Sequence, residues 1–298
     1  MIGFAPSRLA AAVALGLTLT ACGAVAGAAG SPHPARGSGS ARPAGGPGAT
    51  PRQSAASPGA EPATPSRSAA TGKQPPAAPL PLAGITVGID PGHNGDNRYY
   101  PAYIGHLVWN GREWEACDTT GTETDAGYTE ALFTFRVATF LRADLRKLGA
   151  RVVMTRSSND GVGPCVDKRS EIINRAHASV ALDIHADGGP PSGRGFAILE
   201  PVADGPNDRV IGSSERLALD VRRELLRYTS MPESDYYGVH GLIHRDDLAG
   251  LNLTTVPKVL VECGNMRNPV DARLLTSGGF QRALARAFTA AILGFLHR

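Results

Sequence analysis

A long stretch near the amino terminus of this 298-residue sequence lacks the residues that form a hydrophobic core. Between Gly23 and Pro81 there is no Phe, Tyr or Trp, and the composition is almost entirely Ala, Pro, Gly, Ser and Thr. Such a segment buries too little apolar surface to offset the conformational entropy lost on folding. We therefore predict a disordered linker over residues 23–81 and one folded domain over residues 82–298.

The sequence also lacks a strong net charge, since the formal value is only +3. It contains no basic stripe and no RRM, KH or helix-turn-helix pattern, so nucleic acid is not an expected partner. We expect the protein to be a monomer.

The apolar run at the amino terminus, Leu9 to Thr20, is too short for a permanent transmembrane helix. It follows Arg8 and has the length of a signal-peptide core, which predicts export with residues 1–22 as the signal peptide. The run ends in LTAC, which resembles a bacterial lipobox and predicts a lipid on Cys22 that anchors the domain to the outer face of the cytoplasmic membrane. The alternative is cleavage after Ala26, which would give a soluble secreted or periplasmic protein.

The folded domain alternates short β-branched runs with segments of helical periodicity. This alternation predicts an α/β fold with a parallel sheet and right-handed crossovers. The predicted strands cover residues 85–90, 151–155, 179–184, 195–199 and 258–262, and the predicted helices 128–148, 168–177, 213–228 and 280–296.

A hairpin insertion is predicted after the first strand. Asn110-Gly111 lies between two extended arms, and this pair favours a type I′ turn. Trp109 and Trp114 flank the turn, where they either pack on each other across the strands or contact a ligand.

Three polar residues lie at the carboxyl ends of predicted strands, where open α/β sheets bind ligands. These are His93, His185 and Glu262; Glu130, in the first turn of the first helix, can point to the same edge. Two histidines and a carboxylate suit a zinc ion with an open coordination position. Spacing alone leaves open that His93 only shapes a turn and that Glu130 only stabilises a helix start.

Five segments in order, IDPGHNGD, YTEALF, VVMTRSSND, LDIHAD and PKVLVECGNMRN, resemble the zinc-dependent N-acetylmuramoyl-L-alanine amidases of the amidase-3 type. The resemblance extends over nearly the whole folded domain. It implies a mostly parallel, six-stranded sheet flanked by helices. It also implies a peptidoglycan or muropeptide substrate, cleaved at the amide between N-acetylmuramic acid and L-alanine.

Carried over residue by residue, the resemblance makes His93, Glu130 and His185 the zinc ligands and Glu262 the catalytic carboxylate. Zinc would polarise the amide and lower the pKa of a water, and Glu262 would pass the water proton to the leaving amine. The alternatives are a zinc peptidase that cuts elsewhere in the stem peptide and a wall-binding protein without catalysis.

Several further polar residues have two interpretations each. Asp90 either orients a ligand histidine or shapes the Pro-Gly turn. His240 and His244 either contact substrate or have surface and packing roles. Asp183 and Asp187 stand where the amidases often have serine and asparagine, and neither is a proposed ligand.

Three cysteines remain after export, and an oxidising compartment favours one pair. We predict a disulfide between Cys117 and Cys165, since both lie in loop-like segments, worth roughly 4 kcal/mol by loop entropy. Cys263 adjoins a buried strand end, where a small buried thiol is more common than a nucleophile.

Overall fold

A computed structural model describes residues 78–297 of the chain. The predicted signal peptide, Cys22 and nearly all of the predicted linker lie outside the described residues, so these assignments stay predictions. Among the described residues, none of the helices combines the length and apolar character needed to span a bilayer.

The domain is built on one six-stranded sheet, which confirms the predicted fold class. The strand order is β4-β1-β5-β8-β6-β7, and every neighbouring pair is parallel except β6 and β8. The central strands β1, β5 and β8 are almost wholly buried, as expected for a sheet covered on both faces. The strands are β1 (Thr86–Pro91), β4 (Arg151–Met154), β5 (Val180–Asp187), β6 (Ala197–Pro201), β7 (Leu242–Arg245) and β8 (Lys258–Asn265).

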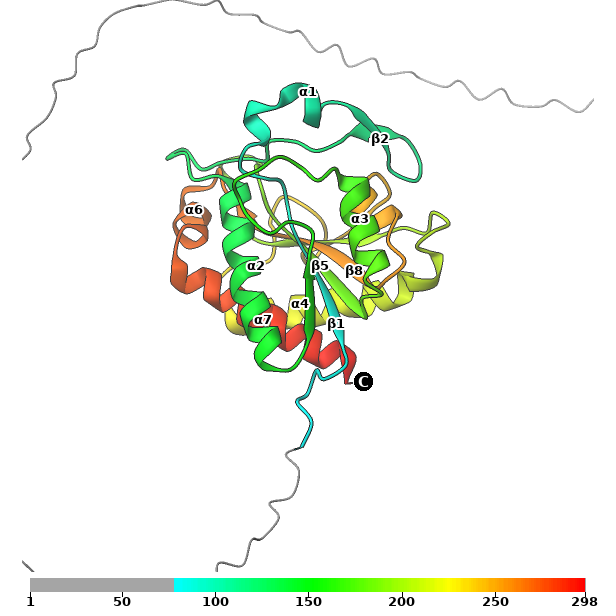
Figure 1. The fold of residues 1–298 in the computed structure, drawn as a ribbon. Coiled ribbons are helices and arrows are strands. Elements are labelled where there is room, and N and C mark those ends of the chain that lie inside the picture. Colours follow the sequence, from blue (N-terminus) through cyan, green and yellow to red (C-terminus); the bar gives the residue numbers. More distant parts are fainter. Residues whose placement is uncertain (1–77, 298) are drawn as a thin grey trace, which may run out of the picture. The chain divides into compact units, whose positions relative to one another are not determined.

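Helices cover both faces of the sheet (Figure 1). On one face α7 packs against both α2 and α4, and on the other α3 packs with the short α5. In α2 the residues Phe133, Val137 and Leu141 recur at helical spacing and are fully buried, so periodicity located this helix well. The helices are α1 (Pro101–Ile104), α2 (Glu130–Lys147), α3 (Val166–Arg175), α4 (Ile211–Tyr228), α5 (Ala249–Asn252), α6 (Pro269–Leu275) and α7 (Gly278–Leu296), with 3₁₀ turns η1 (Asn97–Tyr99) and η2 (Asp208–Val210).

The hairpin insertion forms β2 (Leu107–Trp109) and β3 (Trp114–Ala116), but its turn is not the predicted two-residue type. Trp109 pairs with Trp114, so four residues form the loop. The Asn110 carboxamide oxygen accepts hydrogen bonds from the backbone N–H groups of Arg112 and Glu113, which stabilises the longer turn. The two indoles lie edge to face with ring centroids 5.6 Å apart, as expected for a packed cross-strand pair.

The predicted disulfide between Cys117 and Cys165 is present. Both cysteines are buried with Val108, in a small apolar cluster between the hairpin and the start of α3. The bond therefore ties the insertion to the rest of the domain. Cys263 is free and buried on β8.

Two features of the sheet differ from the sequence prediction. Strand β5 continues three residues beyond its predicted end, so His185 lies within the strand rather than after it. Strand β7, between His240 and the last strand, was not predicted at all. It is a half-buried edge strand with polar residues, so it lacks the apolar run by which the central strands were recognised.

Candidate metal centre

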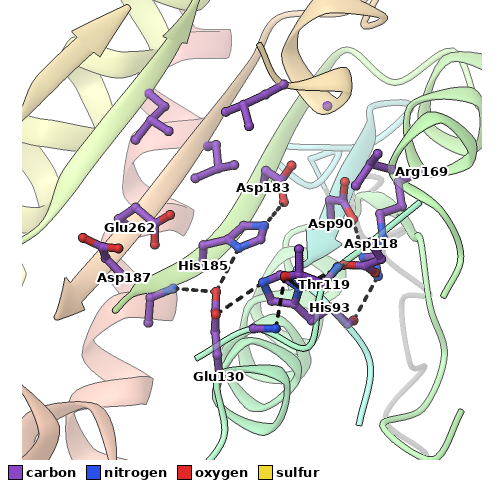
Figure 2. A pocket seen from close by; sticks show the side chains of 18 of the residues that line it. Asp90, His93, Asp118, Thr119, Glu130, Arg169, Asp183, His185, Asp187 and Glu262 are labelled. Atoms are coloured by element: carbon purple, nitrogen blue, oxygen red, sulfur yellow. Dashed lines mark hydrogen bonds and ion pairs between the residues drawn. The ribbon is translucent and has the colours of Figure 1, made fainter. Parts of the chain in front are cut away.

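A cavity of about 490 Å³ opens beyond the carboxyl ends of β1, β5 and β8. Its lining includes all four residues named from the sequence, His93, Glu130, His185 and Glu262. Figure 2 shows Glu130 reaching between the two imidazoles, with Glu262 on the neighbouring strand. The structure thus brings together residues that are up to 169 positions apart, because parallel strands end at one edge of the sheet.

His93 sits in a backbone conformation that disfavours most side chains. Its φ is +56°, in the left-handed region, directly after the Pro91-Gly92 end of β1. The imidazole is held at both nitrogens: Nδ1 lies 2.9 Å from an oxygen of Asp118, and Nε2 lies 3.3 Å from Glu130 Oε2. A strained residue whose side chain is fixed in this way is typical of a functional position.

Glu130 is the first residue of α2 and is almost completely buried. The backbone N–H groups of Thr122 and Ala186 donate to its two carboxylate oxygens at 2.9 and 3.1 Å. His185 Nδ1 lies 2.9 Å from Glu130 Oε1. One carboxylate oxygen therefore faces each imidazole, and both rings present a nitrogen to the same point.

Two glycines leave the space that this convergence needs. A Cβ on Gly92 would lie 2.3 Å from the ring of His185, and a Cβ on Gly121 would lie 2.7 Å from the ring of His93. Any side chain at either position would displace an imidazole. The Pro-Gly turn thus allows both histidines to approach each other, with ring centroids 5.0 Å apart.

Glu262 lies beside His185 in the sheet, since the two are register partners on β8 and β5. Its Oε2 atom is inaccessible and has no hydrogen-bond partner among the described residues. The pKa of Glu262 is raised to about 8, mainly by burial and further by the nearby Glu130 and Asp187 carboxylates. The imidazoles of His185 and His93 act in the opposite direction but do not cancel the rise. A carboxylate that readily takes up a proton is suited to general base and general acid chemistry.

The two histidines and Glu130 shift one another's pKa values. Burial alone would lower the pKa of His93, but Glu130 and Asp118 raise it to about 9. Burial likewise opposes ionisation of His185, and Asp183 with Glu130 raises the pKa of His185 well above its usual value. Conversely, the two imidazoles hold the pKa of Glu130 well below its usual value despite its burial. In the metal-free protein this site therefore attracts positive charge.

The donor set fits a zinc ion. Donor atoms of His93, Glu130 and His185 all lie within 4.8 Å of one another. Two imidazole nitrogens and a carboxylate oxygen are ligands that zinc takes in catalytic sites, where a fourth position stays open. The ring nitrogen of His93 that faces away from this point is hydrogen-bonded to Asp118, as is usual for metal-bound histidines. The corresponding nitrogen of His185 lies 3.2 Å from Asp183 Oδ1, an ion-pair contact without hydrogen-bond geometry.

Sequence reasoning missed part of the supporting structure. Asp118 was not considered, yet it contacts His93. Asp183 was not expected to matter for the ligands, yet its Oδ1 lies 3.2 Å from His185 Nε2. The contact of Asp118 could not be found from local patterns, because it depends on how distant segments pack. Asp183 and His185, by contrast, are two residues apart on β5, and the alternation of a strand places both on one face, which is the signal that could have found this contact.

The other candidates have separate roles. Asp90 does not contact a histidine, but it accepts hydrogen bonds from the Thr155 hydroxyl and from Arg169. His240 and His244 are more than half exposed and do not line the cavity, which supports their surface interpretation. Cys263 faces the hydrophobic core, whereas its neighbour Glu262 faces the cavity, so the thiol is placed away from the site.

A pH dependence of stability follows from these pKa shifts. In the folded, metal-free protein the pKa is about 9 for His93 and about 8 for Glu262, against 6.5 and 4.5 as ordinary values. Both groups therefore bind more protons when the chain is folded, and their stabilisation is lost as the pH rises through the folded pKa values. We expect the Tm of metal-free protein to fall between pH 6.5 and pH 9, measured by calorimetry.

Zinc should reduce this fall, because the imidazoles then bind metal instead of protons. The increase in Tm on adding zinc should accordingly grow from pH 6.5 to pH 9. A Tm of the metal-free protein that stays constant or rises over this range would contradict the assigned pKa shifts.

Comparison with known proteins gives a consistent result. A family model described as N-acetylmuramoyl-L-alanine amidase matches residues 87–294. The N-acetylmuramoyl-L-alanine amidase Rv3717 of Mycobacterium tuberculosis is 41% identical over 219 residues, which cover 73% of this chain and 89% of that protein. The N-acetylmuramyl-L-alanine amidases Ami1 of Mycobacterium smegmatis and Mycobacterium abscessus are 43% and 40% identical, each with a TM-score of 0.68. Each alignment covers 72% of this chain, and 98% and 100% of the two solved chains.

Proposed function

This chain belongs to the family of N-acetylmuramoyl-L-alanine amidases, and from that premise we propose that it cleaves peptidoglycan with a zinc ion held by His93, Glu130 and His185. The bond cleaved is the amide between N-acetylmuramic acid and the L-alanine of the stem peptide. The convergence of three metal-binding side chains in one cavity is the observation that carries the zinc assignment.

The chemistry is divided between the metal and Glu262. When bound, zinc would polarise the amide carbonyl and lower the pKa of a water. Glu262, the register partner of His185 with an unpartnered oxygen, takes the proton from the attacking water. It then donates this proton to the amine nitrogen of L-alanine as the amide bond breaks.

The alternatives identified from the sequence are less well supported. A wall-binding protein without catalysis has no use for a buried carboxylate with a raised pKa beside three ligands. A zinc peptidase acting elsewhere in the stem peptide would have the same site chemistry, so only the product distinguishes it.

The test is the identity of the products. Purified protein incubated with peptidoglycan should release stem peptides whose new amino terminus is L-alanine, which mass spectrometry and amino-terminal labelling detect. Chelator-treated protein serves as the control. A different amino-terminal residue would establish a peptidase, and no release by zinc-loaded protein would reject the amidase assignment.

A peptidoglycan hydrolase is expected to act in the cell envelope. We further propose, from the sequence alone, that a lipid on Cys22 holds the domain at the outer face of the cytoplasmic membrane. Cell fractionation of wild type and Cys22→Ser distinguishes this location from secretion, because only an anchored protein would leave the membrane fraction on substitution.

A further inference from the structure

The two ligand histidines belong to one closed ring of buried polar groups, in which Glu130 joins them on the metal side and five further residues join them on the other side. Each side chain of the ring contacts the next at 2.9 to 3.3 Å. Figure 2 shows most of these side chains around the cavity. In order, the ring consists of His93, Asp118, Arg169, Asp90, Lys258, Asp183, His185 and Glu130.

Lys258 is the most unusual member of this ring. It is the first residue of β8 and is completely buried. Its Nζ lies 2.9 Å from Asp90 Oδ2 and 3.1 Å from Asp183 Oδ2. A lysine ammonium is almost never fully buried unless it is paired, because desolvation is costly. Neither the fold nor the proposed reaction accounts for its presence here.

The contact between Lys258 and Asp183 fixes the second carboxylate oxygen. With Oδ2 held by the ammonium, the buried Oδ1 of Asp183 lies 3.2 Å from His185 Nε2, an electrostatic contact that lacks hydrogen-bond geometry. Gly250 of α5 packs closely against this ion pair, since a Cβ there would lie 2.9 Å from Asp183 Oδ2 and 3.3 Å from Lys258 Nζ. The carboxylate therefore has little freedom, and it turns His185 so that Nδ1 faces Glu130.

The charges of the ring also match a dication. It contains four carboxylates, namely those of Asp90, Asp118, Asp183 and Glu130, and two permanent cations, Arg169 and Lys258. The net charge of the ring is therefore −2 when both imidazoles are neutral, and one zinc ion would neutralise it. Without Lys258 the net charge of the ring would be −3, in a site largely shielded from water.

We propose that Lys258, acting through Asp183, is a positioning residue that orients His185 toward zinc. This inference rests on the proposed zinc site, and it assigns a role to two residues that do not bind the metal. Arg169 and Asp118 form the corresponding pair for His93, at 3.1 Å from each other. The two imidazoles are thus each oriented by an acid that is itself held by a buried cation.

The experiment compares zinc affinity and metal-free stability in the same variants of the full-length protein. Zinc affinity is measured by competition with a chelating fluorophore, and the Tm of the metal-free protein by circular dichroism. Asp183→Asn, which removes the charge at constant volume, should weaken zinc binding by roughly 10- to 100-fold. Lys258→Met should do the same, and the visible spectrum of the cobalt-substituted protein should change in both.

A double variant separates positioning from simple stabilisation. Replacing Lys258 by Met and Asp183 by Ala together removes both members of the pair, so the metal-free Tm should recover relative to Lys258→Met alone. Zinc affinity should nevertheless stay low, because His185 has lost its partner. Lys147→Met, at an exposed lysine on α2, is the matched control and should leave both measurements unchanged.

The outcomes are distinct. Folded Asp183→Asn and double variants that bind zinc as tightly as wild type would overturn the positioning role, whatever their catalytic activity. If Lys258→Met does not fold, these two variants still decide the question. Wild-type protein that binds no zinc would instead reject the proposed metal site itself.

Discussion

Glu262→Gln is expected to lower kcat on peptidoglycan by about 10²- to 10⁴-fold, the range associated with general acid and base catalysis. Glutamine has nearly the same shape as glutamate but cannot accept the water proton. Since Glu262 is not among the three proposed zinc ligands, the zinc affinity of the variant should stay close to that of wild type. Stem-peptide release and zinc affinity should be measured on the same preparation.

The matched control is Glu215→Gln, which changes an exposed glutamate on α4 and should leave kcat unaltered. A Glu262→Gln variant with wild-type kcat would show that another group moves the proton. A variant that had lost zinc as well would show that Glu262 belongs to the metal centre rather than acting beside it.

The second large effect is expected from removing a zinc ligand. His93→Ala should reduce the zinc content from about one per chain to near zero and abolish activity, since only two protein ligands would remain. The loss of affinity should exceed the roughly 10- to 100-fold cost of removing a hydrogen-bond partner of a ligand. Metal analysis of the purified protein and stem-peptide release are the two measurements.

His240→Ala is a close control, because His240 also has a positive φ, of 53°, yet its side chain is 76% exposed and outside the cavity. Any cost of placing alanine in the left-handed region is therefore similar in the two variants. If His93→Ala retained zinc and activity, the proposed ligand set would be wrong; full activity of the chelated wild-type enzyme would exclude zinc dependence.

The sequence was most informative where the packing of an element follows from its own residues. The apolar spacing in α2 and the β-branched runs in β1, β5 and β8 each specify a buried face, so these elements were located to within a few residues. The Asn110-Gly111 turn was less predictable. There the Asn110 carboxamide oxygen accepts hydrogen bonds from the backbone of Arg112 and Glu113, and its Nδ2 donates to the distant Asp247 carbonyl at 3.3 Å, so that a longer loop forms.

The candidate site was predictable for a related reason. In a mostly parallel sheet the carboxyl ends of the strands meet at one edge, so the sequence alone predicts that His93, His185 and Glu262 lie together there. Glu130 was also a candidate from its place in the first turn of a helix, but spacing alone could not distinguish it from an ordinary acidic helix start, and the family resemblance gave it the role of a ligand.

The sequence by itself thus determined the α/β class, and it predicted which residues could bind a metal. Only the tertiary structure decided how those residues are held. The contact of His93 with Asp118, and the contacts of Asp118 and Asp183 with buried cations, join segments that are distant along the chain. Such contacts depend on side-chain direction and on the close approach allowed at Gly92, Gly121 and Gly250, which local sequence patterns do not encode.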